Sequence, residues 1–164
     1  MRAVAIIAFV AWPIATSSGA SSKLQRREPA CEIIDYGRYK AESQRVSHPD
    51  PGSVTGERFE IDSVRFFKQT KQIPATLGQR FGIRYRLRQL PPRATTITWR
   101  VTYPAPVRGS KGWEHSFRET PGNGELVQHL LYDFVFASEV VTGTWDFAVL
   151  VDGRRACSFS FQVD

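Results

Sequence analysis

Apolar and polar residues alternate with a period of two through most of the chain after Glu60, and no other feature restricts its fold as strongly. Such alternation is typical of strands that pack one face on a core and expose the other to water. The aromatic and β-branched residues in these runs also favour strands. The most regular runs, each predicted to be a strand, cover residues 81–87, 97–103, 130–136, 145–151 and 157–163.

Three less regular segments predict further strands. Residues 31–40 form the first, with a bulge at Gly37, and residues 113–118 form a short one. Residues 61–66 change phase once, which a bulge or a bend near Asp62 and Ser63 explains. Asp152-Gly153 predicts a hairpin turn, because both residues tolerate positive φ. Seven or eight strands without a helical period predict an all-β, antiparallel immunoglobulin-like β-sandwich, and a small closed β-barrel is the alternative.

The first twenty residues predict export. Arg2 precedes an apolar run over residues 4–14, and small residues follow up to Ala20, as in a signal peptide cleaved after residue 20. Cleavage after Ser17 is the alternative. An uncleaved membrane anchor fits less well, since the run has about 11 residues and a spanning helix needs about 20. We therefore expect a signal peptide over residues 1–20, a disordered leader over 21–30 and a single domain over 31–164.

Both cysteines, Cys31 and Cys157, lie in the exported part of the chain. Two cysteines in an exported protein are most simply one disulfide, and two buried free thiols are the alternative. A bridge would close a loop of about 126 residues and stabilise the fold by about 5 kcal/mol in the chain-entropy picture. The domain is large enough to fold without a metal, and we expect neither a metal site nor a cofactor.

Residues that could support catalysis are scattered. His48, His115 and His129 lie far apart in the sequence, and neither an HExxH motif nor a paired CxxC motif occurs. The Gly-x-Ser-x-Gly motif of serine hydrolases is also absent, because Ser53 lacks the second glycine. We therefore expect a protein that is not an enzyme. A hydrolase would require His115 or His129 to meet a carboxylate and a nucleophile in a pocket.

Arginines occupy the polar side of one predicted strand. The net charge is +6, and loss of Arg2 with the signal peptide leaves +5. Guanidinium groups bind carboxylates and phosphates in bidentate geometry. We therefore predict a ligand site at Arg84, Arg86, Arg88 and Arg100. Its partner would be an anionic glycan, a lipid head group or an acidic envelope protein, whereas export makes nucleic acid an unsuitable partner.

Plainer interpretations of this row stay open. The exposed face of any antiparallel sheet carries charges, and acidic residues on neighbouring strands, such as Asp133, can pair with arginines at about 0.2–1 kcal/mol each. Arg80 is a further candidate member of the row. The segments 41–57 and 104–112 are predicted to be long polar loops, which on a rigid sandwich either carry binding or simply connect strands.

Short motifs along the chain resemble a known family. They are Ile73-Pro74-Ala75, Leu77-Gly78, Phe81-Gly82, Glu139-Val140, Gly143-Thr144-Trp145 and Phe159-Ser160-Phe161-Gln162-Val163. The chain resembles, over residues 32–164, the small bacterial exported proteins catalogued as domain of unknown function number 3859. The resemblance implies a bacterial periplasmic or secreted protein and brings no catalytic residue.

These features predict a non-catalytic binding module of the bacterial envelope. The alternative is a structural or accessory subunit that docks on another envelope protein through a sheet edge or an apolar patch.

Overall fold

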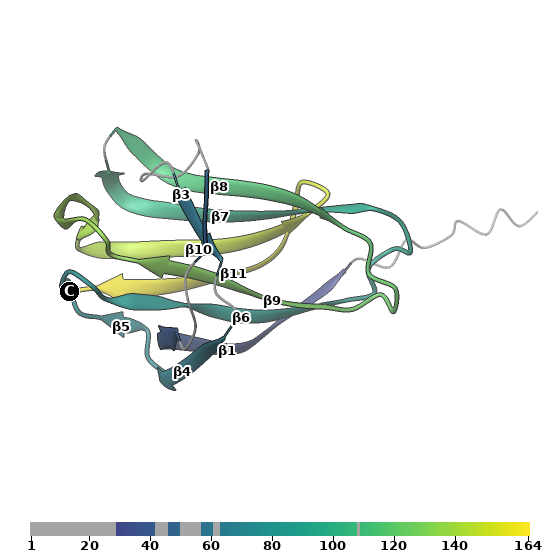
Figure 1. Cartoon of the computed structure of the whole chain (residues 1–164), viewed down its shortest axis with the longest axis horizontal. Helices are drawn as coiled ribbons and strands as arrows, with labels where there is room; N and C mark the ends of the chain where they lie inside the picture. The colour runs from purple at the N-terminus through teal and green to yellow at the C-terminus, as the bar shows by residue number, and fades with distance from the viewer. Residues whose placement is uncertain (1–28, 42–45, 50–56, 61–62, 108) are drawn as a thin grey trace, which may run out of the picture.

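The computed structural model describes residues 29–41, 46–49, 57–60, 63–107 and 109–164. Most strands in this part form two packed sheets, and two more form a separate pair (Figure 1). The helical element in these residues is the short 3₁₀ turn η1 (Ala137–Glu139). The predicted signal peptide and all but the last two residues of the predicted leader lie outside the described residues, so both stay predictions.

The first sheet has the strand order β4-β1-β6-β9, and all its neighbours run antiparallel. Its strands are β1 (Ala30–Ala41), β4 (Val64–Lys68), β6 (Arg80–Arg88) and β9 (Leu126–Asp133).

The second sheet has the order β5-β11-β10-β7-β8 and is antiparallel except for the pairing of β5 with β11. Its strands are β5 (Gln72–Ile73), β7 (Thr95–Val107), β8 (Ser110–Glu119), β10 (Gly143–Val151) and β11 (Arg154–Val163). Because both sheets are open, the alternative of a closed barrel is wrong.

The core lies between the two sheets and is built from the inward residues of the alternating runs. Its largest fully buried side chains include Trp145, Tyr85 and Phe81. Phe81 on β6 meets Trp145 on β10 edge-on, with ring centroids 5.9 Å apart, and Phe161 on β11 at 5.2 Å. The period-two pattern therefore identified the buried face correctly.

A disulfide joins the two sheets. Cys31 on β1 is bonded to Cys157 on β11, with Cα atoms 5.6 Å apart. The predicted bridge is confirmed, and it ties the first described strand to the last one.

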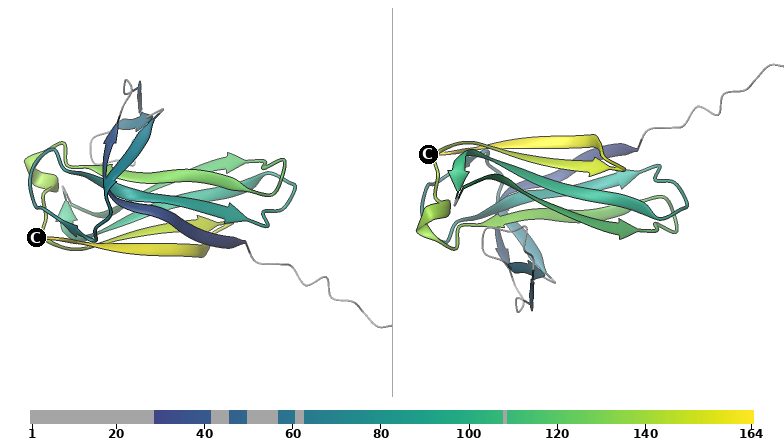
Figure 2. Two further views of the ribbon diagram at one scale, coloured as in Figure 1. Left: turned by 90° about the horizontal axis from the view of Figure 1, so that it is seen from below. Right: turned by 90° about the horizontal axis from the view of Figure 1, so that it is seen from above.

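An arm stands out from the first sheet (Figure 2). Residues 30–38 of β1 pair with β6, whereas residues 38–41 pair with β4, so the end of β1 leaves the sandwich together with β4. Beyond them, β2 (Val46–Pro49) and β3 (Glu57–Glu60) form a separate antiparallel pair. The prediction of a plain loop over 41–57 is therefore wrong where the segment is described.

Three other expectations about strands need correction. Segment 104–112 is not a loop, because β7 continues to Val107 and pairs there with Ser110 at the start of β8. The short strand predicted over 113–118 is the middle of β8. Gly37 is not the bulge in β1, since the register shifts between Ile33 and Asp35. β2, β3 and β5, of two to four residues each, escaped prediction because they are too short to show alternation.

The run over residues 130–136 ends as a strand at Asp133. The backbone N–H groups of Val135 and Phe136 donate to the carboxylate of Glu139 at 2.7 and 2.8 Å, instead of to a neighbouring strand. Phe134 stays buried, whereas Phe136 is 40% exposed. Local capping therefore overrides the alternating pattern here.

Among the described residues, no helix has the length and apolar character needed to cross a membrane.

Candidate functional site

The predicted arginine row lies on the outer face of the first sheet. Arg84 and Arg88 are exposed and Arg86 is half-buried, because these positions alternate with the buried Tyr85 and Leu87. β1 and β9 flank the row on either side. The structure thus brings three of the four predicted ligand-binding arginines to one face.

Acidic side chains neutralise two of these three arginines. The Glu32 carboxylate lies 3.6 Å from Arg86 and 3.4 Å from Arg88, and Glu125 lies 3.0 Å from Nε of Arg86. All four side chains are at least 30% exposed, so each pair contributes no more than about 1 kcal/mol. The row is therefore largely an ion-paired sheet surface, as the plainer interpretation expects.

Arg84 has no ion pair with any described residue. Its cross-strand neighbours are Asp35 on β1 and His129 on β9. Burial lowers the pKa of His129 below its ordinary value, and the charge of Arg84 lowers it further, while Asp35 acts in the opposite direction. The His129 ring also stacks on Phe66, with centroids 6.3 Å apart. The lowered pKa favours the neutral form of His129 near pH 7, so this residue adds little positive charge to the row.

Arg100 does not belong to this surface. It lies on β7 in the second sheet, where its Nε is 2.7 Å from Oε2 of Glu114. The prediction that Arg100 shares a site with Arg84, Arg86 and Arg88 is wrong in this respect, because alternation assigns a residue to a face of its strand and not to a sheet.

A second charged surface lies at the base of the arm. We call it the arm patch and define it as Arg38, Lys40, Phe67, Lys68 and Lys71. Cζ of Arg38 lies 5.1 Å from the centroid of the Phe67 ring, and Nζ of Lys40 lies 5.4 Å from it. Both are cation–π distances. The Phe67 ring is 42% exposed, so an apolar group lies in contact with two cations at the protein surface.

A bulge in β4 places Phe67 there. Arg38 pairs with Lys68, and the next residue, Tyr39, pairs with Phe66, so Phe67 is an extra residue on β4. Bulges often turn a side chain to a new direction. Phe66 packs toward Tyr39, with ring centroids 6.1 Å apart, whereas Phe67 contacts the cations. Two successive phenylalanines therefore have different surroundings.

The base of the arm has an excess of positive charge. Residues 38–41 and 63–71 contain five basic side chains and no acidic one. Within the described part of the chain, Arg38, Lys40, Lys68 and Lys71 form no ion pair, in contrast to Arg86 and Arg88. Nζ of Lys71 lies 5.1 Å from the ring of Phe159 on β11. Sequence reasoning missed this surface, and the available signal was the doubled Phe66-Phe67 between basic residues.

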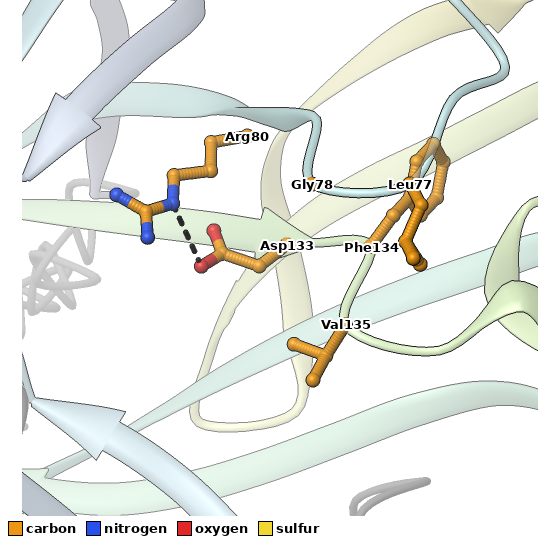
Figure 3. A pocket seen from close by; sticks show the side chains of 6 residues that line it. All are labelled: Leu77, Gly78, Arg80, Asp133, Phe134 and Val135. Carbon is orange, nitrogen blue, oxygen red and sulfur yellow. Dashed lines mark ion pairs between the residues drawn. The ribbon is translucent and has the colours of Figure 1, made fainter.

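A shallow pocket of about 250 Å³ lies at one end of the sandwich (Figure 3). Its polar groups are Arg80 and Asp133, which form an ion pair at 3.3 Å, and the Tyr39 hydroxyl donates to the same carboxylate. Its apolar lining includes Leu77 and Val135, which are 60% and 39% exposed. Each oxygen of this carboxylate thus has a partner within the protein.

His115 and His129 lie on different sheets, His115 on β8 and His129 on β9. His129 makes no hydrogen bond to a carboxylate in the described part of the chain, and His115 lies between the rings of Trp113 and Phe117, at 5.9 and 6.1 Å. No group of three or more potential metal ligands occurs among the described residues. Ser53 lies outside them.

Comparisons with known proteins give a family and a fold. The profile of the family described as domain of unknown function (DUF3859) matches residues 27–163. An immunoglobulin-like protein from Pseudomonas aeruginosa is similar in structure, with a TM-score of 0.54, 25% identity, and coverage of 85% of this chain and 99% of that chain. An alkylpurine DNA glycosylase from Pseudomonas fluorescens, bound to DNA with an abasic site analog, aligns over 57% of this chain and 27% of its own, with a TM-score of 0.44 and 17% identity. No curated protein matches the sequence. The first likeness confirms the predicted immunoglobulin-like sandwich.

Proposed function

The chain belongs to the family of domain of unknown function DUF3859, and we propose that it acts as a non-catalytic binding module of the bacterial envelope that takes an anionic partner on its arm patch. The immunoglobulin-like sandwich serves as the rigid support, and the arm patch lies where the arm leaves it. Loops and projections on rigid sandwiches commonly carry function in this way.

The observation that carries this proposal is the difference in charge compensation between two basic surfaces. Arg86 and Arg88 are paired with Glu32 and Glu125, whereas the arm patch holds four cations without an ion pair to a described residue. Cations that no nearby carboxylate neutralises repel one another, and the positive field that they create attracts an anionic partner. Arg84, which also has no ion pair to a described residue, lies apart on the outer face of the first sheet and remains a candidate anion contact of the predicted arginine row.

The disulfide supports an exported location. A bridge between Cys31 and Cys157 persists in oxidising compartments such as the periplasm or the exterior, and is rare in the cytosol. The apolar start of the sequence is consistent with the same interpretation. We therefore propose the periplasm or the cell exterior as the place where the partner is met.

The test is a charge-removal experiment with a matched control. In the first variant, Lys40→Gln, Lys68→Gln and Lys71→Gln remove three exposed cations of the arm patch. In the control, Lys111→Gln, Arg118→Gln and Arg154→Gln remove three exposed cations of the second sheet and change the net charge equally. The probes are phosphatidylglycerol vesicles, polygalacturonate and polyglutamate, used in binding assays at increasing salt.

We expect binding to at least one probe, weakening as salt rises, because exposed charges are screened within about 8–10 Å at ordinary ionic strength. The arm-patch variant should bind at least about tenfold more weakly, since a basic residue near an anionic surface contributes about 1 kcal/mol. The control should bind like the wild type. Absence of binding to all three probes, or equal losses in both variants, would contradict the proposal.

A second candidate function rests on the apolar end of the sandwich. Leu77, Val135 and Phe136 are exposed around the shallow pocket, and the contacts of Glu139 hold the loop of the last two in place. Such a surface suits docking on another envelope protein. It differs from the first candidate in its salt dependence, because apolar contacts do not weaken as salt rises.

A further inference from the structure

We propose that the arm patch binds the surface of an anionic phospholipid membrane, with Phe67 entering the head-group region and the surrounding cations contacting lipid phosphates. This inference rests on the proposed function and narrows its anionic partner to one class. It is carried by an exposed aromatic ring in contact with two cations that form no ion pair with a described residue.

The first step concerns Phe67 itself. Its ring is 42% exposed, although the residue before it, Phe66, packs toward Tyr39 and His129. The bulge in β4 gives Phe67 this position, and a regular strand would pair it across from β1. An exposed aromatic ring held out by a specific backbone irregularity has apolar area available for a partner.

The second step concerns the cations around the ring. Arg38 and Lys40 lie 5.1 and 5.4 Å from the ring centroid, so any partner that covers Phe67 also comes within reach of both charges. Lys68 follows directly in the chain, and Lys71 lies over Phe159 at 5.1 Å. A partner must therefore offer an apolar region and several negative charges within a small area.

The third step compares the classes of anionic partner. A dissolved polyanion satisfies the cations, but it offers the ring at most the C–H face of a sugar or the stem of a side chain and no apolar region that the ring can enter. A phospholipid surface supplies both parts, because aromatic rings settle at the level of the head groups while Lys and Arg contact the phosphates. The guanidinium of Arg38 is well suited to phosphate, which it can contact through two parallel hydrogen bonds.

The experiment measures co-sedimentation of the protein with vesicles. One set of vesicles contains phosphatidylcholine with phosphatidylglycerol, and the other contains phosphatidylcholine alone. Polygalacturonate and polyglutamate serve as soluble polyanions in a parallel binding assay. The variant Phe67→Ser removes the ring, and the control Val127→Ser removes an apolar side chain of the same sheet that is 37% exposed. Circular dichroism establishes that both variants are folded.

We expect binding to the phosphatidylglycerol vesicles and not to phosphatidylcholine alone. Phe67→Ser should weaken vesicle binding about tenfold, in keeping with the removal of a buried aromatic ring from the interface, while Val127→Ser should leave it unchanged. Phe67→Ser should alter binding to either soluble polyanion by less than about twofold, because the cations remain.

The lipid inference is overturned if the protein binds polygalacturonate or polyglutamate more tightly than the vesicles, or if Phe67→Ser binds the vesicles like the wild type. In either case, the proposed anion-binding function still stands. If none of the anionic probes binds, both the inference and the proposed function fall.

Discussion

At the scale of single residues, the environment of His129 shows how neighbouring charges set chemistry on the outer face of the first sheet. The pKa of His129 is lowered below 6.5 mainly by burial and then by the charge of Arg84, its cross-strand neighbour. As the pH falls, His129 therefore takes up a proton at a higher pH in the unfolded chain than in the folded chain. Stability supported by neutral His129 is complete above pH 6.5 and is lost as the pH falls from there toward the lowered folded pKa.

Removing the charge of Arg84 should raise the pKa of His129 toward its ordinary value. We expect Arg84→Gln to do this because one of the two causes of the lowered pKa disappears, and an NMR titration of the His129 imidazole measures it. Arg88→Gln is the control, since Arg88 lies on the same strand and is paired with Glu32. An unchanged titration in Arg84→Gln would show that burial alone lowers the pKa.

At Glu139, a single side chain ends the alternating pattern of a strand. Its carboxylate is buried, with 2% exposure, and accepts the backbone N–H groups of Val135 and Phe136. These contacts give the two backbone N–H groups an acceptor, and they stabilise the buried carboxylate of Glu139 at the same time. The alternation over residues 130–136 could not predict this ending, because it depends on a residue three positions further along the chain.

At the scale of strands, the close approach of β6 to β9 depends on Gly82. A Cβ atom added to Gly82 would lie 2.4 Å from the carbonyl oxygen of Leu130 on β9. Backbone atoms cannot yield at that distance without separating the strands. The sequence motif Phe81-Gly82 therefore has a packing explanation.

Gly82→Ala should destabilise the domain by about 2 kcal/mol or more, because the strands must move apart to admit the methyl group. Urea unfolding measures the loss. Gly122→Ala is the matched control, since nothing lies within 4 Å of a Cβ atom there. Equal stability of the two variants would mean that β6 and β9 adjust their spacing at little cost.

The arm is the element that sequence patterns described least well. Its strands are short, and β1 changes partner from β6 to β4 near Arg38. The bulge at Phe67 then breaks the two-residue period within the five residues of β4. Periodicity needs several repeats to be recognised, so a short strand with an extra residue carries almost no signal.

At the scale of the whole molecule, the disulfide joins the two sheets between β1 and β11. Replacing both cysteines, Cys31→Ser with Cys157→Ser, should lower the free energy of unfolding by about 2–5 kcal/mol, because the unfolded chain loses a large loop constraint. Urea unfolding of the oxidised protein, the reduced protein and the double variant measures this effect. The reduced protein and the variant should agree, and equal midpoints for all three would contradict the expectation.

The sequence by itself determined the strands with long alternating runs, the face that each of them buries, the sandwich they build and the pair of cysteines available for a bridge. These properties follow from local periodicity and from the burial of apolar area, which a single strand already encodes. Only the tertiary structure decided which basic residues form an ion pair with another described residue. Ion pairing depends on which strands become neighbours. Glu32 pairs with Arg86 and Arg88, Glu125 pairs with Arg86, and Glu114 pairs with Arg100 in the other sheet. None of the described acidic residues pairs with Lys40 or Lys68.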